Sequence, residues 1–188
     1  NTNTNVGDTI VCTATATDSD AEFATSSTSV IVDNTPPSVS GVSISPSTVY
    51  NDTVVTCTGT ANDPDESVTP SIEWFVAGQP VGNGGTLDMA TTPAVPGDGL
   101  ECVMSGNDGN GGSDSSNVSV TVQNRAPVVS SVTINPGTPV EGVDDVICSA
   151  VATDPDGDNV TLGYDWSEVN GGTANGDTLS ASLTTGGE

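Results

Sequence analysis

The sequence predicts an all-β protein built from antiparallel β-sandwiches, and three observations lead to that fold class. Thr, Ser, Gly, Val, Asp and Asn dominate the 188 residues, a mixture that suits strands and turns. No apolar stretch has a helical period over a length sufficient for a helix. Short alternating runs are instead separated by Gly, Pro, Asn and Asp, as in a sandwich.

The middle of the chain is expected to form one complete domain, residues 36–125. Antiparallel strands of a sandwich are short and are bounded by turn residues. The alternating runs predict such strands near 38–45, 53–61, 70–77, 85–90, 99–106 and 116–123.

An internal repeat divides the rest of the chain. The matching segments are 29–37 and 118–127, 39–46 and 129–136, 55–65 and 147–156, 72–74 and 164–166, and 85–87 and 177–179. The first copy continues through 97–108, which contains Cys102, whereas the second stops at Glu188 before its own version of this segment. The counterpart of 97–108 is 7–18, which contains Cys12. The order is therefore half a repeat (1–35), a whole repeat (36–125) and the complementary half (126–188).

The order and approximate spacing of Cys57, Trp74 and Cys102 follow the immunoglobulin pattern of a cysteine, a tryptophan and a second cysteine on strands B, C and F. With the Asp-Pro-Asp and Asn-x-x-Pro motifs, the sequence resembles the bacterial tandem immunoglobulin-like, PKD-like and cadherin-like repeats of surface proteins. The resemblance implies a Cys57–Cys102 disulfide in the complete domain. It also implies that 126–188 supplies strands A to E of a second immunoglobulin-like domain, and 1–35 its strands F and G.

The split repeat leaves Cys148 without a second cysteine downstream, and Cys12 is the equivalent of that cysteine. The two ends of such a sandwich lie at opposite poles, separated by about 30 Å for strands of eight to ten residues at about 3.3 Å per residue. Linkers as short as 34–37 and 124–127 do not let both halves meet on one side of the complete domain. We therefore expect Cys12 to bond to Cys148 of the neighbouring unit. The head-to-tail contact gives an open helical polymer, made either of separate chains or of one continuous polypeptide.

The charge of the chain excludes several functions. With 25 acidic residues, one arginine, no lysine and no histidine, the formal net charge is -24. Nucleic acids and anionic membrane surfaces need clustered Lys and Arg, so neither is an expected partner. Membrane insertion is not expected either, because no stretch approaches the roughly 18 apolar residues of a transmembrane helix. Nucleophilic triads and Schiff-base chemistry lack their residues, so the protein is predicted not to be an enzyme.

Four cysteines in strands, without histidine, predict disulfides in an oxidising, extracellular compartment and not zinc ligands. The chain starts at Asn1 and shows no signal peptide, so we expect it to be a mature fragment or a window of a longer protein.

Acidic residues gather in the loops where one domain is expected to meet the next, which predicts two calcium sites because Ca²⁺ binds six to eight oxygen ligands. The alternative is that Asp, Pro and Gly simply make good turns. The candidate ligands are Asp33, Asn34, Asp63, Asp65 and Asp108 at the first junction, and Asn124, Asp154, Asp156, Asp158 and the neighbour's Asp18 at the second.

Three segments match the N-glycosylation sequon, at Asn51, Asn117 and Asn159. In a chain this rich in Asn, Ser and Thr such matches also arise by chance, and exposed Ser and Thr offer sites for O-linked sugars instead.

These expectations favour a structural subunit of an extracellular filament, a glycoprotein that assembles with itself head-to-tail. The alternative is a calcium-rigidified stalk of a large cell-surface adhesin or secreted enzyme. Direct carbohydrate or receptor binding is a third reading, disfavoured because Trp74 and Trp166 are assigned to cores and few aromatic residues remain for stacking on a sugar.

Overall fold

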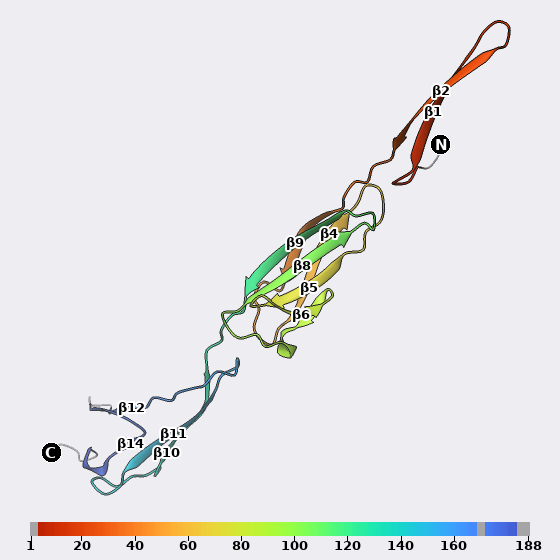
Figure 1. Cartoon of the computed structure of the whole chain (residues 1–188). Helices are drawn as coiled ribbons and strands as arrows, with labels where there is room; N and C mark the ends of the chain where they lie inside the picture. Colours follow the sequence, from red (N-terminus) through yellow and green to blue (C-terminus); the bar gives the residue numbers. More distant parts are fainter. Residues whose placement is uncertain (1–3, 169–171, 184–188) are drawn as a thin grey trace. The chain divides into compact units, whose positions relative to one another are not determined.

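The structure, a computed structural model, describes residues 4–168 and 172–183 and is built from β-strands with two short 3-10 helices (Figure 1). The chain divides into two compact units, Asn1–Gln123 and Asn124–Glu188. The first unit contains a two-stranded hairpin and a complete sandwich, and the second contains a partial sandwich. The predicted all-β sandwich fold is confirmed.

Two antiparallel sheets form the complete domain. One sheet has the order β3-β4-β7 and the other the order β6-β5-β8-β9. The 3-10 helix η1 follows β7, and the side chain of Asp88 caps it by accepting from the Ala90 N–H at 3.0 Å. The elements are β3 (Ser38–Ser45), β4 (Val54–Asn62), β5 (Ser71–Val76), β6 (Gln79–Asn83), β7 (Thr86–Asp88), η1 (Met89–Thr91), β8 (Gly99–Asn107) and β9 (Ser113–Thr121).

Alternate residues of the strands fill the core between these sheets, as a two-residue period requires. Strand β8 shows the alternation most clearly, with Leu100, Cys102 and Met104 buried and their neighbours partly exposed. Trp74 is fully buried on β5, and its indole Nε1 donates to the Gly84 carbonyl at 2.8 Å. The other core residues are Val49, Val55, Cys57, Val76, Leu87, Met89, Ala94 and Val122.

The chain begins with an antiparallel hairpin of β1 (Thr9–Thr17) and β2 (Phe23–Ile31). Every residue of both strands is exposed, including apolar side chains that a sandwich would bury. The hairpin therefore has two strands and no facing sheet among the described residues.

The second unit contains two small sheets, β10-β11-β14 and β12-β13. Its elements are β10 (Val128–Asn135), β11 (Val146–Thr153), β12 (Asp165–Ser167), β13 (Thr173–Asn175), β14 (Thr178–Leu179) and the 3-10 helix η2 (Ala181–Leu183). Trp166 donates from Nε1 to the Gly176 carbonyl at 2.8 Å, as Trp74 does to Gly84. Within 124–168 and 172–183, no strand pairs with β12 in the way that β8 pairs with β5.

The hairpin and the second unit each repeat the strand register of a part of the complete domain. Cys12 pairs with Thr28 across the β1–β2 hairpin, and Cys102 pairs with Val118 across β8–β9, so a shift of 90 residues superimposes the two registers. Under the same shift, the first pair of the hairpin, Thr9 with Ile31, corresponds to Gly99 with Thr121. The last pair, Thr17 with Phe23, corresponds to Asn107 with Ser113. The hairpin is thus a second copy of β8–β9.

The second unit repeats the remaining strands of the complete domain. Ile134 pairs with Cys148 as Ile44 pairs with Cys57. Each pair of strands also has a register shift in the same region, between Val129 and Ser131 in β10 and between Ser40 and Ser43 in β3. Strands β10, β11, β12, β13 and β14 therefore correspond to β3, β4, β5, β6 and β7.

Candidate functional site: the split domain and its acidic junctions

The hairpin exposes apolar positions that are buried in its counterpart. Ile10 is 45% exposed, whereas the equivalent Leu100 is fully buried. Cys12 is exposed, and the equivalent Cys102 is fully buried. One face of β1 therefore has the side chains of a sandwich interior without that interior around it.

The second unit also exposes apolar positions whose equivalents lie in a sandwich core. Val132 and Ile134 on β10 are 61% and 55% exposed, whereas the equivalent Val42 and Ile44 pack against the core of the complete domain. Both sets are apolar, so leaving them in water is unfavourable at about 25 cal/mol for each Å² of apolar surface.

The predicted Cys57–Cys102 disulfide is confirmed, and it links β4 in one sheet to β8 in the other. Within the single chain, Cys12 and Cys148 carry free thiols. Pairing of Cys12 with Cys148 of a neighbouring unit involves a second copy, so it stays a prediction.

The first junction connects the hairpin to the complete domain through hydrogen bonds to carboxylates. The Asn34 side-chain Nδ2 donates to Asp108 Oδ2 at 2.7 Å, and the Thr35 N–H donates to Asp65 Oδ2 at 2.7 Å. Asp108 Oδ1 accepts from the N–H groups of Asn110 and Gly112 at 2.8 and 2.9 Å. Asp108 is buried, 7% exposed, and these donors take the place of water around its charge.

Two oxygen atoms at this junction are buried without a hydrogen-bond partner. They are Oδ1 of Asn34 and Oδ2 of Asp63. The other carboxylate oxygen of Asp63 accepts from the N–H groups of Asp65 and Glu66 at 2.8 and 3.1 Å. A buried acceptor without a donor is unusual in folded proteins, which makes each of these oxygens a candidate partner for a group that donates or is positively charged.

The second junction uses the only cationic side chain of the sequence. Arg125 donates from Nε to Asp156 Oδ1 at 2.9 Å, and its Nη2 lies 2.8 Å from the same oxygen. Its backbone N–H donates to Asp156 Oδ2 at 2.5 Å, as the equivalent Thr35 donates to Asp65. Burial alone would raise the pKa of Asp156, but the hydrogen bonds and the charge of Arg125 lower it overall.

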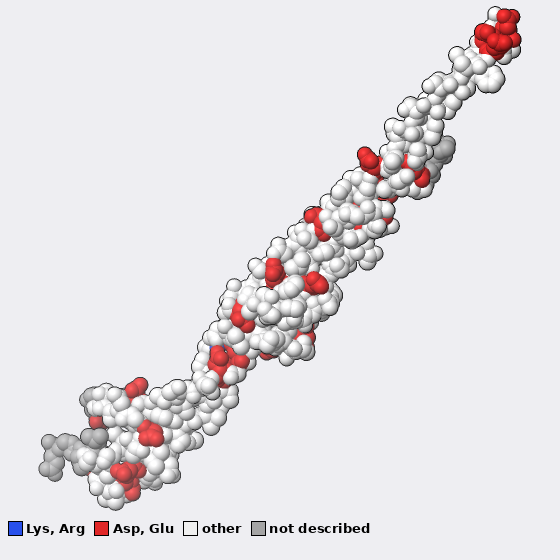
Figure 2. Space-filling view, viewed as in Figure 1, with Lys and Arg blue, Asp and Glu red and all other residues white. Residues whose placement is uncertain are grey.

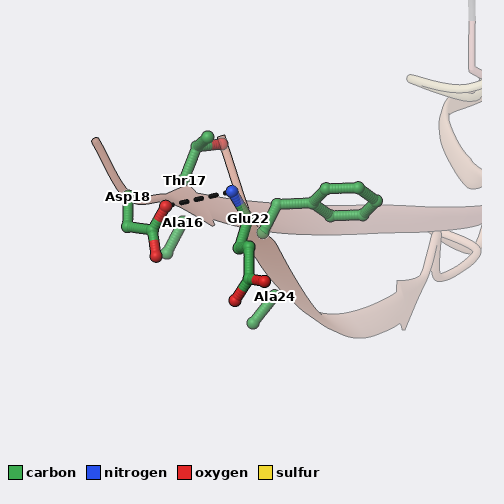
Figure 3. A pocket seen from close by; sticks show the side chains of 6 residues that line it. Ala16, Thr17, Asp18, Glu22 and Ala24 are labelled. Atoms are coloured by element: carbon green, nitrogen blue, oxygen red, sulfur yellow. Dashed lines mark hydrogen bonds between the residues drawn. The ribbon is translucent and has the colours of Figure 1, made fainter. Parts of the chain in front are cut away.

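Acidic side chains also gather at the tip of the β1–β2 hairpin, in the turn that contains Asp18, Asp20 and Glu22 (Figure 2). Asp18 Oδ1 accepts from the Glu22 N–H at 3.0 Å (Figure 3) and from the Asp20 N–H at 3.0 Å. The equivalent Asp108 makes the same two bonds, so the two turns are built alike. A shallow hollow beside this turn is lined by Ala16, Thr17, Asp18, Glu22, Phe23 and Ala24.

The structure brings together only part of each predicted calcium set. Asn34 contacts Asp108, and Asp63 contacts Asp65, through the bonds given above. Asp154 accepts from the Asp156 N–H at 2.8 Å. In the described part of the chain, no three His, Cys, Asp or Glu side chains are grouped so that they could hold a metal. The remaining predicted ligands, Asp33, Asn124, Asp158 and Asp18, are exposed.

The sequence did not reveal the roles of Arg125 at the second junction and of Asp114 in the complete domain. Arg125 was not assigned a role, although its being the only cation in the sequence was a usable signal. Asp114 accepts from the Val39 N–H at 2.7 Å and so joins β9 to β3. Its equivalent in the hairpin is Ala24, and no local pattern distinguishes the two positions.

The three sequon asparagines lie in different settings. Asn51 is in the turn before β4 and is half-buried, whereas Asn117 on β9 and Asn159 after β11 are exposed. Asn117 donates to Glu101 on the neighbouring strand β8. N-glycosylation at any of the three stays a prediction.

Comparisons of the chain with protein-family models, with curated proteins and with solved structures find no match. Among the described residues, no helix has the length and apolar character needed to cross a membrane. Function is therefore inferred from the fold and the junctions alone.

Acid is expected to weaken the first junction through Asp108. The Asn34 amide holds the pKa of Asp108 below its ordinary value of 3.8, and the N–H groups of Asn110 and Gly112 act in the same sense against burial, which raises it. Because the pKa is lower in the folded state, the stabilisation is present above 3.8 and is lost as the pH falls through the folded pKa. The thermal midpoint of the wild type should therefore fall more steeply than that of Asp108→Asn between about pH 4 and pH 2. Parallel curves in thermal melts would contradict this expectation.

Proposed function

We propose that this chain is a structural, non-catalytic subunit of an extracellular filament. In that filament, each copy of the chain completes the split domain of the next copy. The observation that carries the proposal is the shared register: the hairpin repeats β8–β9, and the second unit repeats the strands that β8–β9 complete. The β1–β2 hairpin of one copy of the chain is proposed to pair with β12 of the next copy.

The equivalence specifies which residues meet. Trp74 lies opposite Cys102 between β5 and β8, and Glu73 lies opposite Val103. In the completed split domain, Trp166 is therefore expected opposite Cys12. In the same register, Ile10 and Cys12 enter the core, and Cys12 lies in reach of Cys148 in the way that Cys102 reaches Cys57.

The disulfide supports an extracellular setting, and the net charge supports filaments that stay apart from one another. Disulfides persist in oxidising compartments. A net charge of -24 keeps the lateral surfaces of neighbouring filaments apart by repulsion, while end-to-end contacts of apolar strands remain favourable.

Imaging of the oxidised protein by electron microscopy tests the proposal. The filament proposal predicts a uniform fibre of serial domains, and a protein that remains monomeric at every concentration would contradict it. Intact mass after denaturation and reduction distinguishes separate 188-residue chains from one long polypeptide, and it also detects added sugar.

A calcium-rigidified stalk is a second candidate, favoured by the two buried oxygens without donors, Asn34 Oδ1 and Asp63 Oδ2. These two residues would contribute oxygen ligands to the ion. At the second junction Arg125 already neutralises Asp156, so calcium is expected at the first junction only.

On this second candidate, calcium should raise the thermal midpoint of the protein, because an ion that binds only the folded state at about 100 times its dissociation constant adds about 2.7 kcal/mol. Thermal melts with calcium and with EDTA measure the shift. Asp63→Asn should remove the calcium effect, whereas Asp158→Asn at the second junction should keep it. Identical wild-type melts in calcium and EDTA would exclude this candidate.

A further inference from the structure

In the complete domain, Gly59 on β4 lies close to Met104 on β8 of the facing sheet. Met104 is 2% exposed. A Cβ atom on Gly59 would lie 2.9 Å from its Sδ and 3.0 Å from its Cε, so the end of the Met104 side chain would have to move to make room for it. The absence of a side chain at position 59 thus provides the space that Met104 fills.

The split domain has a different pair at the same two positions. Ala150 on β11 corresponds to Gly59, because Cys148 corresponds to Cys57, and Ala14 on β1 corresponds to Met104. The split domain thus has the larger Ala150 where the complete domain has Gly59, and the smaller Ala14 where the complete domain has Met104. Ala14 next to Gly59 would leave a void, and Met104 next to Ala150 would have to move the end of its side chain, so each residue packs best against its own partner.

We infer that the β1–β2 hairpin is matched to the second unit of another copy of the chain, through Ala14 against Ala150. The inference rests on the proposed head-to-tail function and names the residues that select the partner. Selection is needed because the hairpin and β8–β9 share one register and one cysteine position. Without it, Cys12 would have the same access to Cys57 as to Cys148.

The test gives the hairpin the methionine of the complete domain and then restores the match. The variants are Ala14→Met, the double variant Ala14→Met with Ala150→Gly, and Thr15→Met as a control. Thr15 is next along β1, and its equivalent Ser105 lies on the partly exposed side of β8. Each 188-residue chain is reduced, allowed to reoxidise and followed by light scattering, and the disulfide-linked peptides are identified by mass spectrometry.

Ala14→Met is expected to raise the critical concentration for assembly about tenfold, the effect of about 1.4 kcal/mol of overpacking. The double variant should return to the wild-type value, and Thr15→Met should not depart from it. In the wild type, Cys12 should be found with Cys148 and not with Cys57.

The inference is overturned if Ala14→Met assembles as well as the wild type, if the double variant fails to recover, or if Cys12 of the wild type is found with Cys57. The first two results leave the proposed filament standing, provided that the wild type still assembles, whereas a Cys12–Cys57 link also contradicts completion of the split domain by the next copy. A wild type that does not assemble at all contradicts the proposed function and the inference together.

Discussion

Ile10→Asp is expected to abolish assembly of successive units, whereas Val11→Asp is expected to leave assembly intact. Both side chains are exposed in the single chain, 45% for Ile10 and 58% for Val11, so neither change should affect the isolated protein. In the complete domain the equivalent residues differ: Leu100 is fully buried, and the next residue is the partly exposed Glu101. An aspartate at position 10 would thus be buried without a partner once the split domain is completed.

Leaving a charge buried and unpaired costs about 3 kcal/mol or more, which corresponds to a loss of affinity of about two orders of magnitude. Sedimentation velocity over a range of concentrations measures the effect, and circular dichroism of the monomers serves as the folding control. Equal assembly by the two variants would show that β1 is not inserted in the register of β8. Loss of assembly with Val11→Asp alone would mean that the opposite face of β1 is the buried one.

Replacement of both Cys57 and Cys102 by alanine is expected to lower the free energy of unfolding of the complete domain by about 3–4 kcal/mol. The bridge closes a loop across a sequence separation of 45 residues, so its removal restores much conformational freedom to the unfolded chain. The domain has little else to offset that loss, because its core has a single tryptophan and otherwise mostly small or aliphatic side chains.

Denaturant unfolding followed by the fluorescence of Trp74 measures this loss, in a Trp166→Phe background so that only the complete domain is observed. The reduced parent protein should unfold at nearly the same denaturant concentration as the double alanine variant. A midpoint unchanged by either treatment would mean that the sandwich is stable without the bridge.

The strands were predictable because their side chains alternate between a buried and an exposed face. Leu100, Cys102 and Met104 show the two-residue period directly in the sequence, and the repeat shows each strand pattern twice. Strand β6 was not predicted, because Gln79–Asn83 contains Pro80 and Gly82, residues that weaken a strand signal. The predicted strand 85–90 is divided between β7 and η1, where Asp88 caps the helix.

The place of the junctions was predicted, but the hydrogen bonds that their carboxylates accept were not. The spacing of Asp63, Asp65 and Asp108 from the cysteines located them in the loops next to Asn34. What neutralises each carboxylate depends on contacts between distant residues, which spacing does not contain. Asp156 lies 31 residues from Arg125, and Asp108 lies 74 from Asn34, so the hydrogen-bond donors became visible only in the folded chain.

The most direct test of the proposal that successive units complete each other uses two isotopic forms of the protein. Chains labelled with ¹⁵N and unlabelled chains are mixed under reducing conditions, allowed to assemble and oxidise, and digested for mass spectrometry. The account predicts linked peptides that join Cys12 of one form to Cys148 of the other, at the frequency of random mixing. Linked peptides of one isotopic form only, Cys12 joined to Cys12, or both thiols free in assembled material would contradict it.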